Sequence, residues 1–276
     1  MSQIWEHASK KNPCPICKRD NWCTFGERAM LCQRVESTHP ASKGGWYHFY
    51  DNNVKPVYVP KAKAPPRQID AHSMLFNWRK TTGELDIKSL AGNLGGHFAA
   101  LVSMGVAYSA RYGAWAFPMF DGDGSMIGIR LRNDEGFKWA VTGSRQGIFL
   151  PSPLVKVQPI AFLPEGPTDT AAGLSLGLYT IGRPTCMSGN DQVKAALKRL
   201  GIHRAVIVSD NDELKQLGPR EGRPGIEGAA KIKKELGISS IIWIPPAPIK
   251  DLREFLNKGG TKELIESSIK NKVWSK

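Results

Sequence analysis

The sequence has no long apolar run. None of its segments reaches the roughly 18 consecutive apolar residues that a membrane-spanning helix requires. The N-terminus, MSQIWEHASKKNPCPIC, lacks the apolar segment of a secretory signal peptide. There is also no internal repeat, and no Gly-x-x-x-x-Gly-Lys-Ser/Thr loop of the kind that an attached ATPase would carry. We therefore predict a cytoplasmic protein without a membrane partner.

Acidic residues are fewer than basic ones. The 276 residues include 25 Asp and Glu against 38 Lys and Arg, which gives a net charge of +13 and an isoelectric point near 9.6. A positive field attracts polyanions, and nucleic acid is the commonest polyanion inside a cell. Because many basic proteins bind other acidic partners, the charge alone is only a weak indication of nucleic-acid binding.

Cysteine is scarce but concentrated. Four of the five cysteines lie within residues 14–32, and in a reducing compartment such a group indicates a metal site rather than disulfides. Cys14 and Cys17 lie in a tight turn, while Cys23 and Cys32 flank a predicted β-hairpin. Four thiolates suit one tetrahedral, structural Zn²⁺ ion. A unit of about 50 residues has only a small core, so metal binding would stabilise its fold.

One of the zinc ligands has an alternative. His48 or, less favourably, His39 can replace Cys23, although we favour four cysteines. Basic and aromatic residues are interleaved around the cysteines: Lys10, Lys11, Lys18, Arg19, Arg28 and Arg34 with Trp22, Phe25 and Trp46. Basic groups that hold phosphates beside aromatic faces that stack bases are typical of single-stranded nucleic-acid binding. The alternative is that most of these aromatic residues form the core of the small unit.

Proline marks a boundary after this unit. Residues 51–68 carry four prolines among four basic residues and predict a semi-extended basic linker. At about 3.1 Å per residue, such a linker reaches about 50 Å. We therefore predict a small β zinc-ribbon domain at residues 1–50, tethered to a larger α/β part that begins at residue 69.

The larger part changes its pattern near residue 158. Residues 69–158 predict a mixed α+β subdomain, with helices near 70–80 and 96–105 and strands at 115–120, 126–132 and 137–141. From 159 to 276, four short apolar runs are each followed by a helix-length segment: IAFLPEG, LYTIGR, AVIVSDND and SIIWIP. This alternation indicates a parallel sheet with helices on its faces.

Carboxylates follow several of these apolar runs. Glu165 follows IAFLP, with Asp169 one helical turn later; Asp210 and Asp212 follow AVIVS, and Asp251 opens a late helix. Because the carboxyl ends of parallel strands meet at one edge of a sheet, we expect these acids to converge. Crowded carboxylates stay ionised when cations neutralise them, and Mg²⁺ bound through carboxylates and substrate phosphates fits. Taken singly, three of the five acids have simpler interpretations as helix caps or turn residues.

The predicted strand MIGIRLR (126–132) carries a second functional group. Its alternation places the apolar residues on one side, and Arg130 and Arg132 on the other. Lys138 and Arg145 extend this basic line. We expect a ridge that grips the phosphates of a template or a triphosphate, although a solvated outer face is the simpler alternative.

Three acidic segments, EGPTD (165–169), SDND (209–212) and KD (250–251), resemble the motifs of the Toprim domain. Primases, topoisomerases and some nucleases and recombination proteins share that domain. GRPGIEGAAKIKKEL (222–236) resembles the glycine-rich helix start of primases. The cysteine cluster resembles the primase zinc ribbon, in which a His usually stands at the position of Cys17. The chain therefore resembles bacterial and phage-type (DnaG-like) DNA primases over most of its length.

This resemblance implies a DNA primase, a DNA-directed RNA polymerase that makes short RNA primers on single-stranded DNA from nucleoside triphosphates. The catalytic residues that it implies are Glu165, Asp169, Asp210, Asp212 and Asp251. The magnesium or manganese ligands among them are Glu165, Asp210 and Asp212, and Glu165 is also a candidate acid/base. The residues that it implies for nucleic-acid or nucleotide binding are Arg130, Arg132 and Lys138, beside Arg145.

Two other functions remain open. One is a Toprim-family nuclease or recombination factor, in which the same metals activate water. The other is a non-catalytic zinc-containing DNA-binding adaptor, which the loss of an acid would favour; all five acids are present. The chain ends soon after the Toprim-like part. We therefore expect any helicase partner to be recruited through another chain or another surface, and the length favours a phage, plasmid or mobile-element protein.

Overall fold

The computed structural model describes residues 5–42, 44–50, 69–217 and 220–275. The chain divides into two compact units, Met1–Pro66 and Arg67–Lys276. The predicted basic linker, 51–68, lies outside the described residues.

The first unit is a small antiparallel sheet. Its four strands follow in the order β1 (Glu6–His7), β2 (Thr24–Phe25), β3 (Ala29–Cys32) and β4 (Trp46–Phe49). The buried cluster beneath the sheet consists of Ala8, Cys14, Cys23, Phe25, Met30, Cys32 and Tyr50. Phe25 is only 4% exposed, which confirms the core interpretation for that aromatic residue. Since three of these seven residues are cysteines, apolar burial alone gives the unit little stability.

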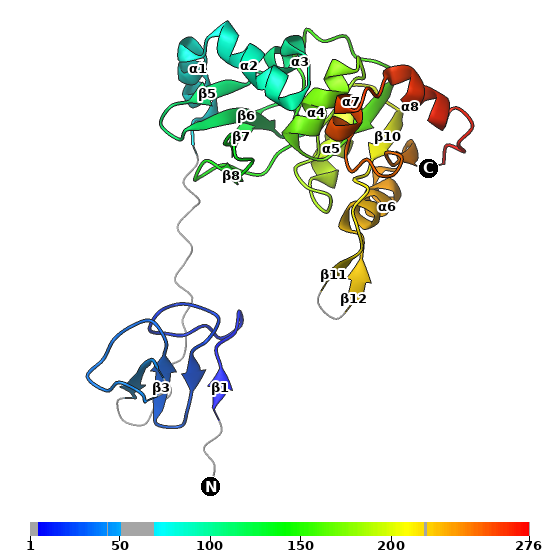
Figure 1. Ribbon diagram of the computed structural model, residues 1–276. Coiled ribbons are helices and arrows are strands. Elements are labelled where there is room, and N and C mark those ends of the chain that lie inside the picture. Colours follow the sequence, from blue (N-terminus) through cyan, green and yellow to red (C-terminus); the bar gives the residue numbers. More distant parts are fainter. Residues whose placement is uncertain (1–4, 43, 51–68, 218–219, 276) are drawn as a thin grey trace. The chain divides into compact units, whose positions relative to one another are not determined.

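The second unit begins with three helices and an antiparallel sheet (Figure 1). The helices are α1 (Ala71–Thr81), α2 (Glu84–Leu94) and α3 (Phe98–Ser103), and the strands, in spatial order, are β5 (Ala107–Ser109), β6 (Ala114–Phe120), β7 (Met126–Arg132) and β8 (Lys138–Ala140). The predicted helices near 70–80 and 96–105 and the three predicted strands are confirmed. The helix α2 was not predicted from the sequence.

The sheet of this subdomain is covered on both faces. Leu75 of α1 packs against Ile129 and Leu131 of β7. Trp115 and Phe117 of β6 belong to a separate cluster with residues of α2 and α3. In the antiparallel register, Trp115 lies opposite Arg132 and Phe117 lies opposite Arg130. Because directly paired residues share a face of the sheet, the two arginines lie on the α2–α3 face, away from α1.

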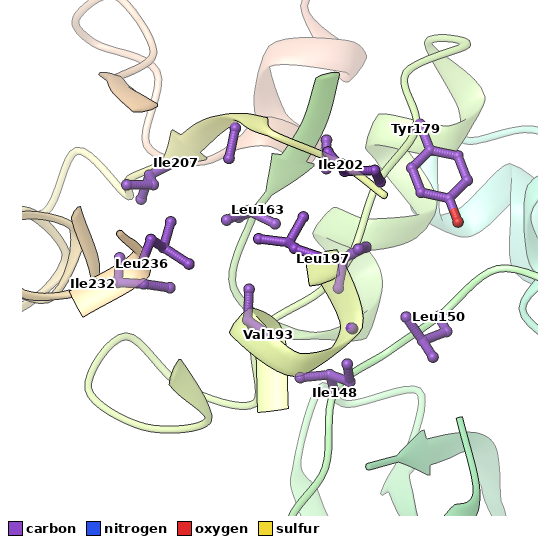
Figure 2. Packing of buried hydrophobic residues seen from close by; sticks show 14 of the residues in the cluster. Ile148, Leu150, Leu163, Tyr179, Val193, Leu197, Ile202, Ile207, Ile232 and Leu236 are labelled. Atoms are coloured by element: carbon purple, nitrogen blue, oxygen red, sulfur yellow. The ribbon is translucent and has the colours of Figure 1, made fainter. Parts of the chain in front are cut away.

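The second subdomain is a parallel three-stranded sheet with the order β13 (Ser239–Trp243), β10 (Arg204–Val208) and β9 (Ile160–Leu163). One face packs on α5 (Asn190–Arg199) and α6 (Pro224–Leu236), as Figure 2 shows. The other face packs on α4 (Gly166–Ser175), α7 (Leu252–Asn257) and α8 (Lys262–Ile269). This three-layer arrangement confirms the predicted α/β class.

One segment that the sequence predicted differently lies beside this sheet. LYTIGR (178–183) does not form a regular strand; it runs along β9 through the isolated parallel bridges Phe162–Thr180 and Glu165–Arg183. It also pairs with Phe149, whose neighbour Ile148 pairs with Phe120 at the end of β6. Short stretches of backbone pairing therefore connect the parallel sheet to the antiparallel one.

An unpredicted hairpin follows Asp212. It consists of β11 (Lys215–Leu217) and β12 (Arg220–Gly222), which come between β10 and α6 in the chain, and it projects away from the parallel sheet in Figure 1. Among the described residues, none of the helices is both long enough and apolar enough to cross a membrane.

Candidate functional site

The four clustered cysteines meet at one point of the first unit. The sulfur atoms of Cys14, Cys17, Cys23 and Cys32 all lie within 4.8 Å of one another. The Sγ–Sγ distances are 3.6 Å from Cys17 to Cys23 and 4.0 Å from Cys23 to Cys32. Tetrahedral ligation at a Zn–S distance of 2.3 Å separates two sulfurs by about 3.8 Å, whereas a disulfide holds them about 2.05 Å apart. The cluster therefore fits a structural zinc ion.

The histidine alternative is wrong. The Nε2 atom of His48 lies 3.0 Å from the carbonyl oxygen of Val35, and His39 contacts the hydroxyl of Thr38 through Nδ1. Neither ring belongs to the sulfur cluster. Cys23, which either histidine would have replaced, is fully buried within the cluster.

In the second unit, the carboxyl ends of the parallel strands bring the five predicted acids to one edge. Glu165 follows β9 and precedes α4, where the next residue, Gly166, adopts a φ of +74°. That left-handed conformation favours glycine and allows the chain to turn directly from the acid into the helix. Asp210 follows β10, and Asp251 precedes the first turn of α7.

Hydrogen bonds fix the loops that carry these acids. The backbone N–H of Asn211 donates to the carbonyl oxygen of Lys250 at 2.7 Å, which joins the loop after β10 to the loop before α7. The N–H of Arg253 donates to the carboxylate of Asp169 at 2.9 Å, which joins α7 to α4. Asp251 accepts from the N–H of Glu254. Asp169 and Asp251 therefore both stabilise the start of α7, in keeping with the simpler capping interpretation.

Asp212 is held at the start of α6. Its Oδ2 accepts from the N–H of Gly225 at 3.1 Å, and its Oδ1 lies 3.2 Å from Nζ of Lys215 in the hairpin. A Cβ atom at position 225 would lie 2.8 Å from the carbonyl oxygen of Asp210. Glycine is therefore required where α6 approaches this acidic loop.

The acids raise one another's pKa values. Burial is the largest cause that raises the pKa of Asp210 to about 7, and the charge of Glu165 is the next. Burial also raises the pKa of Asp169 to about 7, followed by the charge of Asp251. Negative charges from different strands therefore share one partly desolvated region. Within the part of the chain that the structure describes, the four cysteines form the compact group of possible metal ligands, and these carboxylates do not form a second one.

Three of the four predicted basic residues face this acidic edge. Burial lowers the pKa of Arg130, while the charge of Glu165 opposes that change. The pKa of Arg132 is lowered first by burial, and Asp169 and Asp251 oppose the shift. The pKa of exposed Lys138 is lowered first by partial desolvation, against the opposing charge of Asp169.

The side chains of Arg130 and Arg145 differ in their burial. The Nε atom of Arg130 is buried without a hydrogen-bond partner in the described structure, so its guanidinium has an unused donor. Arg145 is exposed, and its backbone N–H donates to Ile127. Its predicted role in binding stays a prediction.

Arg183 is a site residue that the sequence did not reveal. Its side chain is 1% exposed, and its guanidinium donates to the carbonyl oxygens of Leu163, Val208 and Cys186 at 3.0 to 3.3 Å. Two of these carbonyls end β9 and β10, so this arginine ties together the strand ends that carry Glu165 and Asp210. The charges of those two acids also oppose the burial that lowers its pKa. The only available signal was a basic residue that ends the apolar run LYTIGR.

The raised pKa values predict how stability depends on pH when no metal is bound. Asp169 and Asp210 hold their protons to about pH 7 in the folded state, against an ordinary value of 3.8. The folded chain therefore binds more protons than the unfolded chain between pH 4 and pH 7, and its stability falls as the pH rises through that range. A shift from 3.8 to about 7 corresponds to about 4 kcal/mol for each group, so we expect a decrease of several kcal/mol, measured by urea unfolding in magnesium-free buffer.

Asp210→Asn provides the control for this pH prediction, because the amide does not titrate. The decrease in the free energy of unfolding should be smaller in this variant. Magnesium should raise the melting temperature of the wild type more at pH 8 than at pH 5. An identical pH profile for variant and wild type would contradict the prediction.

The fold was compared with known proteins. No family model matches the sequence, and no curated protein sequence matches it. Among solved structures, a DnaG primase catalytic domain bound to single-stranded DNA superposes with a TM-score of 0.55 at 11% identity, covering 74% of this chain and 77% of that chain. The Escherichia coli primase catalytic core gives 0.53 at 12% identity, covering 73% and 79%.

A third match includes a zinc-binding domain. The zinc-binding and RNA polymerase domains of the Aquifex aeolicus primase superpose with a TM-score of 0.53 at 15% identity, covering 70% of this chain and 58% of that chain. At identities of 11–15%, these similarities establish the fold: this chain is folded like a primase catalytic core.

Proposed function

We propose that this protein is a DNA primase that synthesises short RNA primers on single-stranded DNA. The observation that carries the proposal is the meeting of two charged groups from different sheets. Glu165, Asp169 and Asp210 lie at the carboxyl edge of the parallel sheet. From β7, the charge of Arg130 is felt by Glu165, and that of Arg132 by Asp169. Such a pairing suits a triphosphate, because its phosphates need cationic contacts and its metal ions need anionic ones.

The acidic group fits hard divalent cations. Glu165, Asp210 and Asp212 are the residues that would hold Mg²⁺ or Mn²⁺. Magnesium usually keeps several waters and takes only one or two carboxylates together with substrate phosphates, so it does not need a compact cage of protein ligands. When bound, the ions offset the charge that develops on the attacking and leaving oxygens.

The protein's own side chains would orient the reactants. The 3′-hydroxyl oxygen of one nucleotide attacks the α-phosphorus of the next, a phosphodiester bond forms, and pyrophosphate leaves. Glu165, at the junction of β9 and α4, is the candidate acceptor of the hydroxyl proton. Arg130, which has an unpartnered buried Nε, would donate to phosphate oxygens together with Arg132 and Lys138.

The zinc-binding unit would select the template. A DnaG catalytic domain of similar fold is bound to single-stranded DNA, which supports such a template for this chain. We also propose that another chain supplies a replicative helicase partner, and that the protein comes from a phage, plasmid or mobile element. The acidic edge would hold two nucleotides in position, and the zinc-binding unit would bind the template. Together they would allow primer synthesis to start without a pre-existing primer.

The test is incubation with circular single-stranded DNA, Mg²⁺ and labelled nucleoside triphosphates, without any primer. We expect short labelled products that are sensitive to alkali, as RNA is. Asp210→Asn, purified in parallel, controls for a contaminating polymerase. If the DNA is degraded and nothing is synthesised, the chain is a nuclease; if neither occurs while DNA is bound, it is a non-catalytic adaptor.

A further inference from the structure

Trp22 exposes a large aromatic ring on the zinc-binding unit. Its side chain is 75% exposed, whereas the nearby Phe25 is buried in the core. A tryptophan at the surface forgoes the free energy that burying its ring would contribute. Packing within the unit therefore does not explain this side chain.

The backbone of Trp22 is also in an unfavourable conformation. Its φ of +67° lies in the left-handed region, which glycine and asparagine adopt more readily than a bulky residue does. The residue comes directly before the zinc ligand Cys23, so the surrounding loop fixes the direction of the ring. Strained residues of this kind gather at ligand-binding positions.

Arg34 holds the ring in place. The guanidinium carbon lies 5.4 Å from the centroid of the Trp22 ring. The same guanidinium donates to the backbone oxygen of Asn21 at 3.0 Å and to its side-chain oxygen at 2.6 Å. Its Nη1 also lies 3.7 Å from the sulfur of Cys17. Arg34 therefore links the ring to the cysteine cluster, and most of the ring's surface stays exposed.

We propose that Trp22, backed by Arg34, is a platform on which an unpaired base of single-stranded nucleic acid stacks. This inference rests on the proposed function and names the residue through which the zinc-binding unit contacts the template. An exposed aromatic face attracts a base without regard to its identity, and bases in a duplex are already stacked on their neighbours. Lys18 and Arg19, both exposed close by in the chain, supply positive charge for the adjoining phosphates.

The test compares single-stranded DNA binding by full-length variants, measured from the anisotropy of a fluorescein-labelled oligonucleotide. Trp22→Asn removes the ring and keeps a side chain suited to the left-handed backbone. We expect it to weaken binding about tenfold, or about 1.4 kcal/mol, with zinc content retained. The salt dependence of binding should not change, because no charge is lost. Trp22→Tyr, which keeps an aromatic ring at this position, should keep most of the wild-type affinity.

Phe49→Ala is the matched control, because Phe49 is another exposed aromatic residue of the same unit, at 60%. It should bind DNA like the wild type. Unchanged affinity in Trp22→Asn would overturn the inference, and so would an equal loss in Phe49→Ala or in Trp22→Tyr. The proposed function fails separately: if the wild type makes no primers while Trp22→Asn still binds DNA more weakly, only the platform stands.

Discussion

Replacing Asp210 with asparagine should reduce primer synthesis about a thousandfold. The substitution preserves the size of the side chain and removes one negative charge from the edge where metal ions would be held. Metal ions contribute several kcal/mol to the stabilisation of such transition states, and about 4 kcal/mol corresponds to a thousandfold change in rate. The measurement is the initial rate of labelled-nucleotide incorporation on single-stranded DNA at saturating Mg²⁺.

Two comparisons separate this effect from a loss of fold. Glu266→Gln removes a negative charge from the exposed face of α8, where Glu266 pairs with Lys262, and it should leave synthesis unchanged. Asp210→Asn itself should be at least as stable as the wild type without metal, because the native carboxyl is crowded by like charges. If Asp210→Asn keeps more than a tenth of the wild-type rate, Asp210 is not part of the catalytic site.

Replacing Cys32 with serine should abolish zinc binding and unfold the first unit. Apparent binding free energies for structural zinc are about 10–16 kcal/mol, and the seven-residue buried cluster of this unit cannot compensate for such a loss. Zinc content, measured by atomic absorption, should fall from one ion per chain to none. Limited proteolysis should then digest residues 5–50 and leave the second unit intact.

Cys186→Ser is the matched control for the zinc prediction. Cys186 lies in the second unit, outside the cluster, so this variant should retain one zinc ion per chain. If Cys32→Ser retains stoichiometric zinc, the four-cysteine ligand set is wrong. Loss of zinc without increased proteolysis would instead show that the metal does not hold this unit together.

The parts of the site that depend on local pattern were accessible from the sequence. The spacing of Cys14, Cys17, Cys23 and Cys32 indicates one metal ion, because a turn and a hairpin suffice to bring them together. The acids at strand ends were predicted to converge because parallel strands end at a common edge. The alternation in β7 correctly separated the apolar residues from Arg130 and Arg132, since strand periodicity needs no tertiary information.

Other elements could not be predicted from the sequence because tertiary contacts define them. The helix α2 lies between Gly83 and Gly95, and its apolar residues gain stability by packing with α3 and β6. The apolar run LYTIGR suggests a strand, but it pairs with β9 only through isolated bridges. The hairpin after Asp212 has no apolar alternation, so its pairing carried no hydrophobic signal.

The sequence by itself determined that a cysteine cluster precedes an α/β part whose strands end in carboxylates, because turns, hairpins and periodicity are local properties. Only the tertiary structure decided which charges meet. Arg130 and Arg132 face the acids because short stretches of backbone pairing join the two sheets, and Arg183 supports the strand ends from within. Nor does the sequence distinguish the buried Phe25 from the exposed Trp22, since the burial of a side chain depends on residues distant in the chain.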